Sequence, residues 1–199
     1  MEKLILLFLA TCLYGNHDSQ QVSKNITLQY RSDDRCDYQV YPSKSAHFFK
    51  RPGRSVFMLR SMTLPMIYES ISAIIFEKDS LMLYECGGLF WDELTGEETP
   101  EPTLETNIKD LKEFKKNLRK RFNKLDHFRG KDIDKNGLGG ISDGLGYDLS
   151  YCRGLACKTL HFDNPRGYLA QDSTIIELRR FAELIEFLEY KLNRKLAGS

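Results

Sequence analysis

The residues whose types and spacing best suit a chemical role lie between Asp132 and Asp143. They follow the ligand positions of an EF-hand-like loop, in the order Asp132, Asp134, Asn136, the turn glycine Gly137, the carbonyl of Leu138 and finally Asp143. Calcium takes about six to eight oxygen ligands, and this spacing wraps carboxylate, amide and carbonyl oxygens around one point. The sequence therefore contains a candidate calcium loop at 132–143.

The same stretch departs from an EF-hand in three ways. Its eighth position, usually a β-branched or other apolar residue, is Gly139. Its last position is Asp143, whose short side chain reaches a bidentate pose less easily than Glu. The exiting helix is missing from the pattern, because Gly140, Gly144 and Gly146 lead into a strand-like segment. A turn built from Asp, Asn and Gly for positive φ and local hydrogen bonds accounts for these residues equally well. We favour the turn and keep a calcium-stabilised domain as an alternative.

Cysteines supply the second group of candidates. After loss of an N-terminal segment with Cys12, four remain, and an even count in an exported chain fits two disulfides. Cys152 and Cys157 flank four residues that suit a hairpin loop, so we expect the pairs Cys152–Cys157 and Cys36–Cys86; four free thiols are the alternative. Cys152, Cys157 and His161 could together supply three zinc ligands, but the sequence offers no fourth ligand nearby. A disulfide between the two cysteines is therefore favoured over a zinc site.

One cysteine has a candidate catalytic context. Cys86 precedes Gly87 and Gly88 and could present a thiol after a strand, with His47 or His161 as its base. A structural cysteine before a turn is the favoured interpretation. The glycines match neither the dinucleotide-binding nor the P-loop spacing. We therefore expect a non-enzymatic protein and keep a secreted hydrolase with an unrecognised site as the alternative.

The N-terminus predicts a compartment. Residues 1–15 form a short apolar run after one Lys and end in small or turn-forming residues, which is typical of a secretory signal peptide; a buried strand or helix is the alternative. The run is too short to span a bilayer, so no transmembrane span is expected. Cys12 resembles a lipoprotein cleavage box, but Thr11 matches it poorly, so a lipid anchor is the minor hypothesis. A secreted, periplasmic or cell-envelope location follows.

The elements that would position these residues are strands followed by helices. After a polar leader at 16–24, a single domain at 25–199 begins with alternating patterns at 25–30, 36–41 and 55–60. The 67–86 segment fits a helix or a hairpin, and the alternation at 73–76 and 81–84 favours the hairpin. A second hairpin is expected at 146–152 and 156–162, followed by a turn at 163–168.

Two stretches have helical periodicity, about 107–125 and about 174–195. Thr106 or Asn107 is the expected cap of the first, and Thr174 with Glu177 forms a capping box for the second. We predict an α+β fold in which an antiparallel sheet built from hairpins is covered by these two amphipathic helices.

The 107–125 helix carries eight cations on its polar side, namely Lys109, Lys112, Lys115, Lys116, Arg119, Lys120, Arg121 and Lys124. Such a face suits an anionic membrane, nucleic acid or an acidic partner. An acidic connector at 92–105 can neutralise it, and no aromatic residues interleave with the cations to stack bases. The net charge is only +1. We therefore favour a solvated face, expect no nucleic-acid partner, and expect another protein as the partner.

The last third of the chain resembles a known group. Asp143-Gly-x-x-Tyr-x-Leu, a hairpin, Asn164-Pro165 and an amphipathic helix together resemble uncharacterised exported proteins of Bacteroidota-type bacteria. The resemblance implies export and an α+β fold and carries no activity. With 199 residues, 41% of them hydrophobic, the chain is expected to form an exported binding or interaction protein of the cell envelope or exterior.

Overall fold

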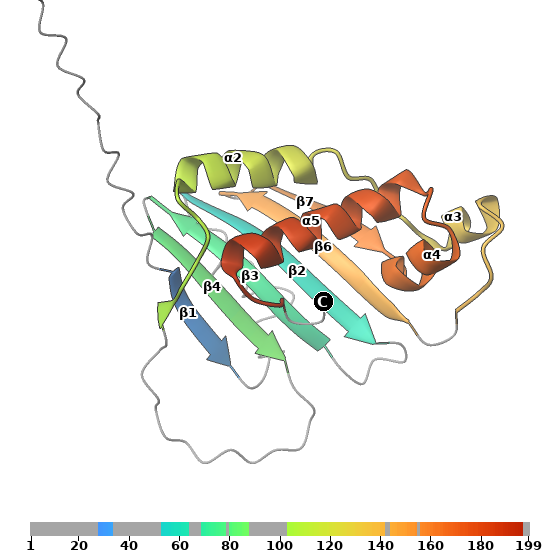
Figure 1. The fold of residues 1–199 in the computed structure, drawn as a ribbon, viewed down its shortest axis with the longest axis horizontal. Helices are drawn as coiled ribbons and strands as arrows, with labels where there is room; N and C mark the ends of the chain where they lie inside the picture. The colour runs from blue at the N-terminus through green and yellow to red at the C-terminus, as the bar shows by residue number, and fades with distance from the viewer. Residues whose placement is uncertain are drawn as a thin grey trace, which may run out of the picture.

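The computed structural model describes residues 28–33, 53–63, 69–78, 80–87, 103–141, 144–154 and 156–196. These residues form one mixed sheet with helices on one of its faces (Figure 1). The elements are β1 (Leu28–Asp33), β2 (Arg54–Thr63), β3 (Glu69–Glu77), β4 (Ser80–Gly87), β5 (Thr103–Leu104), α2 (Leu111–Phe122), α3 (Gly130–Lys135), β6 (Leu145–Arg153), β7 (Ala156–Phe162), α4 (Pro165–Gln171) and α5 (Ile176–Leu192). The predicted α+β class is confirmed.

The described sheet has seven strands in the order β5-β1-β4-β3-β2-β6-β7. Every neighbouring pair is antiparallel except β1 and β4, which run parallel. β2 lies between the β3–β4 hairpin and the β6–β7 hairpin, and Val56 pairs with Ile75 on one side and Cys152 on the other. Among the described strands, β2 is therefore the one that joins the β6–β7 hairpin to the rest of the sheet.

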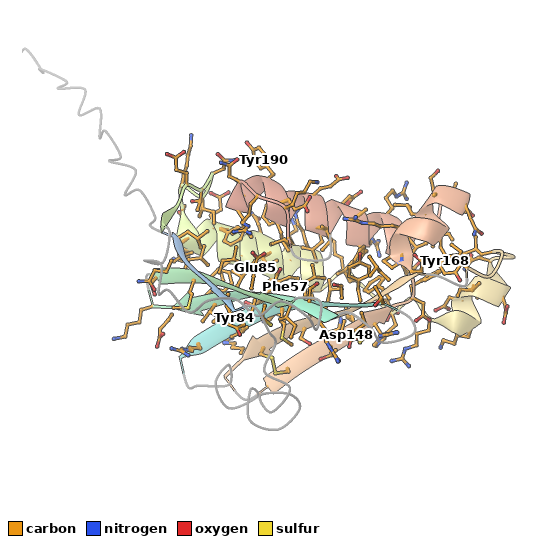
Figure 2. All side chains as sticks on the ribbon, turned by 90° about the horizontal axis from the view of Figure 1, so that it is seen from below. Phe57, Tyr84, Glu85, Asp148, Tyr168 and Tyr190 are labelled. Carbon is orange, nitrogen blue, oxygen red and sulfur yellow. A yellow bond between two sulfur atoms is a disulfide. The ribbon has the colours of Figure 1, made fainter. Side chains whose placement is uncertain are left out.

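The two faces of the sheet differ because side chains alternate along each strand. Phe57, Leu59 and Leu149 point toward α2 and α5 and are fully buried in the main core. Val56, Ala73 and Ile75 point the other way and form a separate small cluster. Figure 2 shows this division, with Phe57 and Glu85 on the helix side and Tyr84 and Asp148 on the opposite side.

Aromatic rings fill the space between the sheet and the helices. Phe181 of α5 has ring centroids 4.8 Å from Phe162 and 5.2 Å from Tyr147. Phe122 of α2 packs edge-on against Phe57 at 6.1 Å. The two helices also touch each other, since Phe114 stacks on Phe187 at 5.7 Å. These contacts fix α2 at one side of the sheet, with α5 beside it (Figure 1).

Both predicted long helices are confirmed, with later starts than expected. α2 begins after Asp110, whose carboxylate accepts from the Glu113 amide at 3.0 Å, while Asn107 instead contacts the end of α5. α5 begins after Ile175, without a side-chain cap, because the Thr174 hydroxyl is bonded to Asp172. The predicted caps were therefore wrong. The side chains of Asn107 and Thr174 form other hydrogen bonds instead of capping the helices.

Two short helices were not predicted. α3 occupies the start of the proposed calcium loop, and α4 occupies most of the segment predicted as a turn. α4 starts at Pro165, where the absent N–H costs nothing, and Asn164 caps it from a left-handed conformation with φ +34. Six- and seven-residue helices are too short to show a periodic apolar stripe.

The strand predictions are largely confirmed. The ambiguous 67–86 segment is the β3–β4 hairpin, and Lys78 lies in its turn with φ +50. Of the strand expected at 25–30, the described part is Leu28 to Tyr30 in β1, and the parallel pairing of β1 with β4 corrects the purely antiparallel sheet that was expected. The expected strand at 36–41, the leader, the signal segment and most of the acidic connector lie outside the described residues.

Candidate anion-binding groove

One flank of α2 is basic because of how the helix meets the core. Phe114, Leu118 and Phe122 recur every four residues and are buried against the sheet. At 3.6 residues per turn, the positions that follow each of them face outward, away from α5. Lys115 and Arg119 occupy this flank. The apolar periodicity that anchors α2 thus also gathers its cations on one side.

This flank forms one wall of a groove of about 580 Å³. The opposite side is formed by the sheet, through Ser55 at the start of β2 and Tyr151 and Arg153 at the end of β6. Ser55 and Arg153 are paired residues on the neighbouring strands β2 and β6, and this pairing sets the distance between them on the sheet side of the groove. The remaining lining residues come from α2 and the turn after it: Lys112, Lys115, Lys116, Arg119, Lys120, Asn123 and Lys124.

The groove carries an unbalanced positive charge. Seven of its ten lining residues are Lys or Arg, and none is Asp or Glu. Within the part of the chain that the structure describes, none of these seven cations makes an ion pair. Other described cations do have partners: Arg54 lies 2.7 Å from Glu77, and Arg194 lies 2.6 Å from Glu85. Like charges are thus held close together, and no carboxylate of the described residues compensates them.

The pKa values in the groove reflect this environment. Burial lowers the pKa of Lys115, and the nearby Arg153 charge lowers it further. Burial raises the pKa of Tyr151, against the opposing effects of a hydrogen bond with Ser55 and the charges of Arg119 and Arg153. A bound anion would favour the charged form of Lys115 and supply the counter-charge that the groove lacks.

Among the described residues, the one aromatic ring that lines the groove is already in contact with the core. Tyr151 lies 5.8 Å from Phe122, centroid to centroid, at 34°. Its hydroxyl is bonded to Ser55. The Lys115 ammonium lies 5.4 Å from the centroid of Phe76, a ring buried in the core. The described lining therefore offers one ring at most, and that ring is held against the core.

Sequence reasoning found the helix cations but missed the sheet side of the groove. Ser55, Tyr151 and Arg153 are distant in sequence from α2, and each is ordinary within its strand pattern. The one available signal was the unusual absence of carboxylates among the outward positions of α2 after Glu113. The expected neutralisation by the connector at 92–105 falls mainly outside the described residues.

The proposed calcium ligands are only partly described. Asp132 and Asp134 lie on α3, two residues apart, so their side chains do not face each other. An Asp132 oxygen accepts from the Arg129 amide at 2.9 Å, and the Asn136 amide donates to the Asp132 carbonyl at 2.7 Å. Leu138 follows after Gly137, which adopts φ +67. Asp143 lies outside the described residues, and among the residues described no group of three His, Cys, Asp or Glu is placed to hold a metal. The calcium loop stays a prediction.

The predicted disulfide Cys152–Cys157 is confirmed, with Cα atoms 4.0 Å apart across the β6–β7 hairpin. These thiols are therefore unavailable as zinc ligands. Cys86 is also disulfide-bonded, which removes it as a nucleophile. Its partner, like Cys36 and His47, lies outside the described residues, so the Cys36–Cys86 pairing stays a prediction.

His161 lies in a charged cluster on the face of the sheet opposite the helices. Its Nδ1 is 2.7 Å from Asp148 and its Nε2 is 2.9 Å from Asp163, while Arg60 lies 3.5 Å from Asp148. Burial would lower the pKa of His161, but the hydrogen bonds and charges of the two carboxylates outweigh it, so the pKa is raised. Because both ring nitrogens are engaged, this histidine is poorly placed to act as a general base.

No protein-family model, curated protein or solved structure matches this chain. Among the residues that the structure describes, no helix combines the length and apolar character needed to cross a membrane.

Proposed function

We propose that this protein is a non-enzymatic binding protein of the cell envelope or exterior, and that it holds an anionic ligand or partner in the groove beside α2. The observation that carries the proposal is the set of seven cations in one concave site, none of which has a carboxylate partner among the described residues. Keeping like charges together destabilises a fold, and an anion that enters the groove reverses that cost.

Export is supported by two independent features. Residues 1–15 have the pattern of a signal peptide. The Cys152–Cys157 disulfide is typical of proteins that fold in an oxidising compartment. The competing hydrolase hypothesis has less support, because Cys86 is disulfide-bonded and both ring nitrogens of His161 face carboxylates.

The proposal is tested by titrating the purified full chain with tripolyphosphate, a compact anion, in a calorimeter at low salt. The variant Lys116→Gln/Arg119→Gln removes two exposed groove cations while keeping good helix formers. The control Lys131→Gln/Lys135→Gln removes the same charge from α3, outside the groove. Each exposed charge contact contributes up to about 1 kcal/mol, so the groove variant should bind about tenfold more weakly.

The control should bind like the parent chain. Equal losses in the two variants would mean that only overall charge matters, and the groove would then have no special role. Added salt should weaken binding to the parent chain more steeply than to the groove variant, since fewer ion contacts remain in the variant.

A further inference from the structure

We infer that the anion is a linear acidic polysaccharide, a sugar chain bearing sulfate or carboxylate groups that lies along α2. This inference rests on the proposed function and adds a ligand class to it. Its starting point is the length of the charged row. Lys112 and Lys120 are separated by two turns of helix, about 12 Å at 1.5 Å per residue. Lys124 follows four residues later, in the turn after α2. A single compact anion contacts only part of such a row.

The polar groups among the cations suit sugars. Asn123 presents an exposed side-chain amide and Tyr151 a partly buried hydroxyl, which is bonded to the buried Ser55; all three line the same groove. Hydroxyl and amide groups both donate and accept hydrogen bonds, as sugar hydroxyls require. A chain whose charges repeat along its length would pair with the Lys and Arg row while its hydroxyls meet the polar side of the groove.

Nucleic acid fits the groove less well. Single strands are held by stacking bases on exposed aromatic faces as well as by charge. Among the described lining residues the one ring is that of Tyr151, which is packed on Phe122 and bonded through its hydroxyl to Ser55. Successive bases would therefore find at most this one ring to stack on.

A membrane surface also fits less well. Helices that bind the bilayer interface insert large apolar side chains beside their cations. Among the described residues, the large apolar side chains left exposed are Ile176 and Tyr190, and both belong to α5. Figure 2 shows Tyr190 on the outer side of that helix.

The test compares ligands and the two ends of the row. Heparin fragments of increasing length supply sulfate, polygalacturonate supplies carboxylate, and single-stranded DNA, phosphatidylserine vesicles and tripolyphosphate supply phosphate in other forms. Lys112→Gln and Lys124→Gln each remove one end of the row, and Lys131→Gln on α3 is the matched control. All are made in the full chain.

We expect affinity for heparin fragments to rise with length and then level off once a fragment spans the row. Each end variant should lower the affinity for the long fragment about threefold, whereas tripolyphosphate should respond to one of them at most. A preference for heparin over polygalacturonate assigns sulfate as the recognised group, and the reverse assigns carboxylate.

Three outcomes overturn the inference while leaving anion binding in the groove intact. Tripolyphosphate could bind as tightly as the longest fragment, or single-stranded DNA or vesicles could bind more tightly than both polysaccharides. In each case Lys116→Gln/Arg119→Gln would still weaken binding about tenfold. If that groove variant binds every anion as well as the parent chain does, the proposed function fails as well.

Discussion

Replacing Lys115 by Met should make the protein more stable and its groove a weaker anion binder. Lys115 has like-charged neighbours three residues before it and four after it, Lys112 and Arg119. Each such helical pair destabilises by about 0.2–0.5 kcal/mol, and the Arg153 charge adds to them. The cation–π contact with Phe76 is lost, at about 0.5–1 kcal/mol, but a Met sulfur on the same ring returns a similar amount.

The net result is a stabilisation of about 0.5–1 kcal/mol, which corresponds to roughly 1–4 °C in Tm for a domain of this size. Differential scanning calorimetry at low salt measures it, and a parallel titration with tripolyphosphate should show about threefold weaker binding. Raising the salt should shrink the difference in Tm, because repulsion between exposed cations is screened. The reasoning is that repulsion between Lys115 and its neighbouring cations destabilises the protein. A variant that is less stable than the parent chain, or one that is more stable but binds the anion equally well, would refute it.

Three further outcomes test other parts of the fold. Arg194→Ala should destabilise by about 2–3 kcal/mol in urea denaturation, because it leaves the Glu85 carboxylate, 8% exposed, without its 2.6 Å partner; no loss would mean that water replaces Arg194. Phe122→Ala should cost about 3–5 kcal/mol, since this ring is 1% exposed, and Phe122→Leu should cost less. The raised pKa of His161 means that its contribution to stability is complete below its unfolded value of about 6.5 and is lost as pH rises through the folded value. His161→Gln should remove that pH dependence, and an unchanged profile would contradict it.

Long elements could be predicted from the sequence because their signal repeats. α5 carries six buried apolar residues at helical spacing, and such a long stripe is typical of an amphipathic helix and of little else. The β3–β4 hairpin could be chosen over a helix because alternating runs flank a short polar turn. α3 and α4 were not predicted, because neither helix is long enough for its pattern to repeat. Their few turns are stabilised by single side chains such as Asn164, and a pattern of that kind also describes a turn.

Pairings between distant strands were beyond local patterns. Nothing in the residues of β1 indicates that Leu28 would pair in parallel with Leu81. The groove was missed for the same reason, because it needs α2 and the end of β6 in one place. Where the partners were close in sequence, as with Cys152 and Cys157, the prediction was confirmed.

The position of β2 has a consequence for how the chain reaches its native state. One neighbour, β3, follows directly, whereas the other, β6, belongs to the last third of the chain. Until that third is available, one side of β2 is an open edge whose N–H and C=O groups can pair with another molecule. Contacts between segments so far apart form slowly, because the loop between them must first be closed. Docking of the β6–β7 hairpin closes this edge, and the order of synthesis supplies that hairpin late, after every other described strand of the sheet.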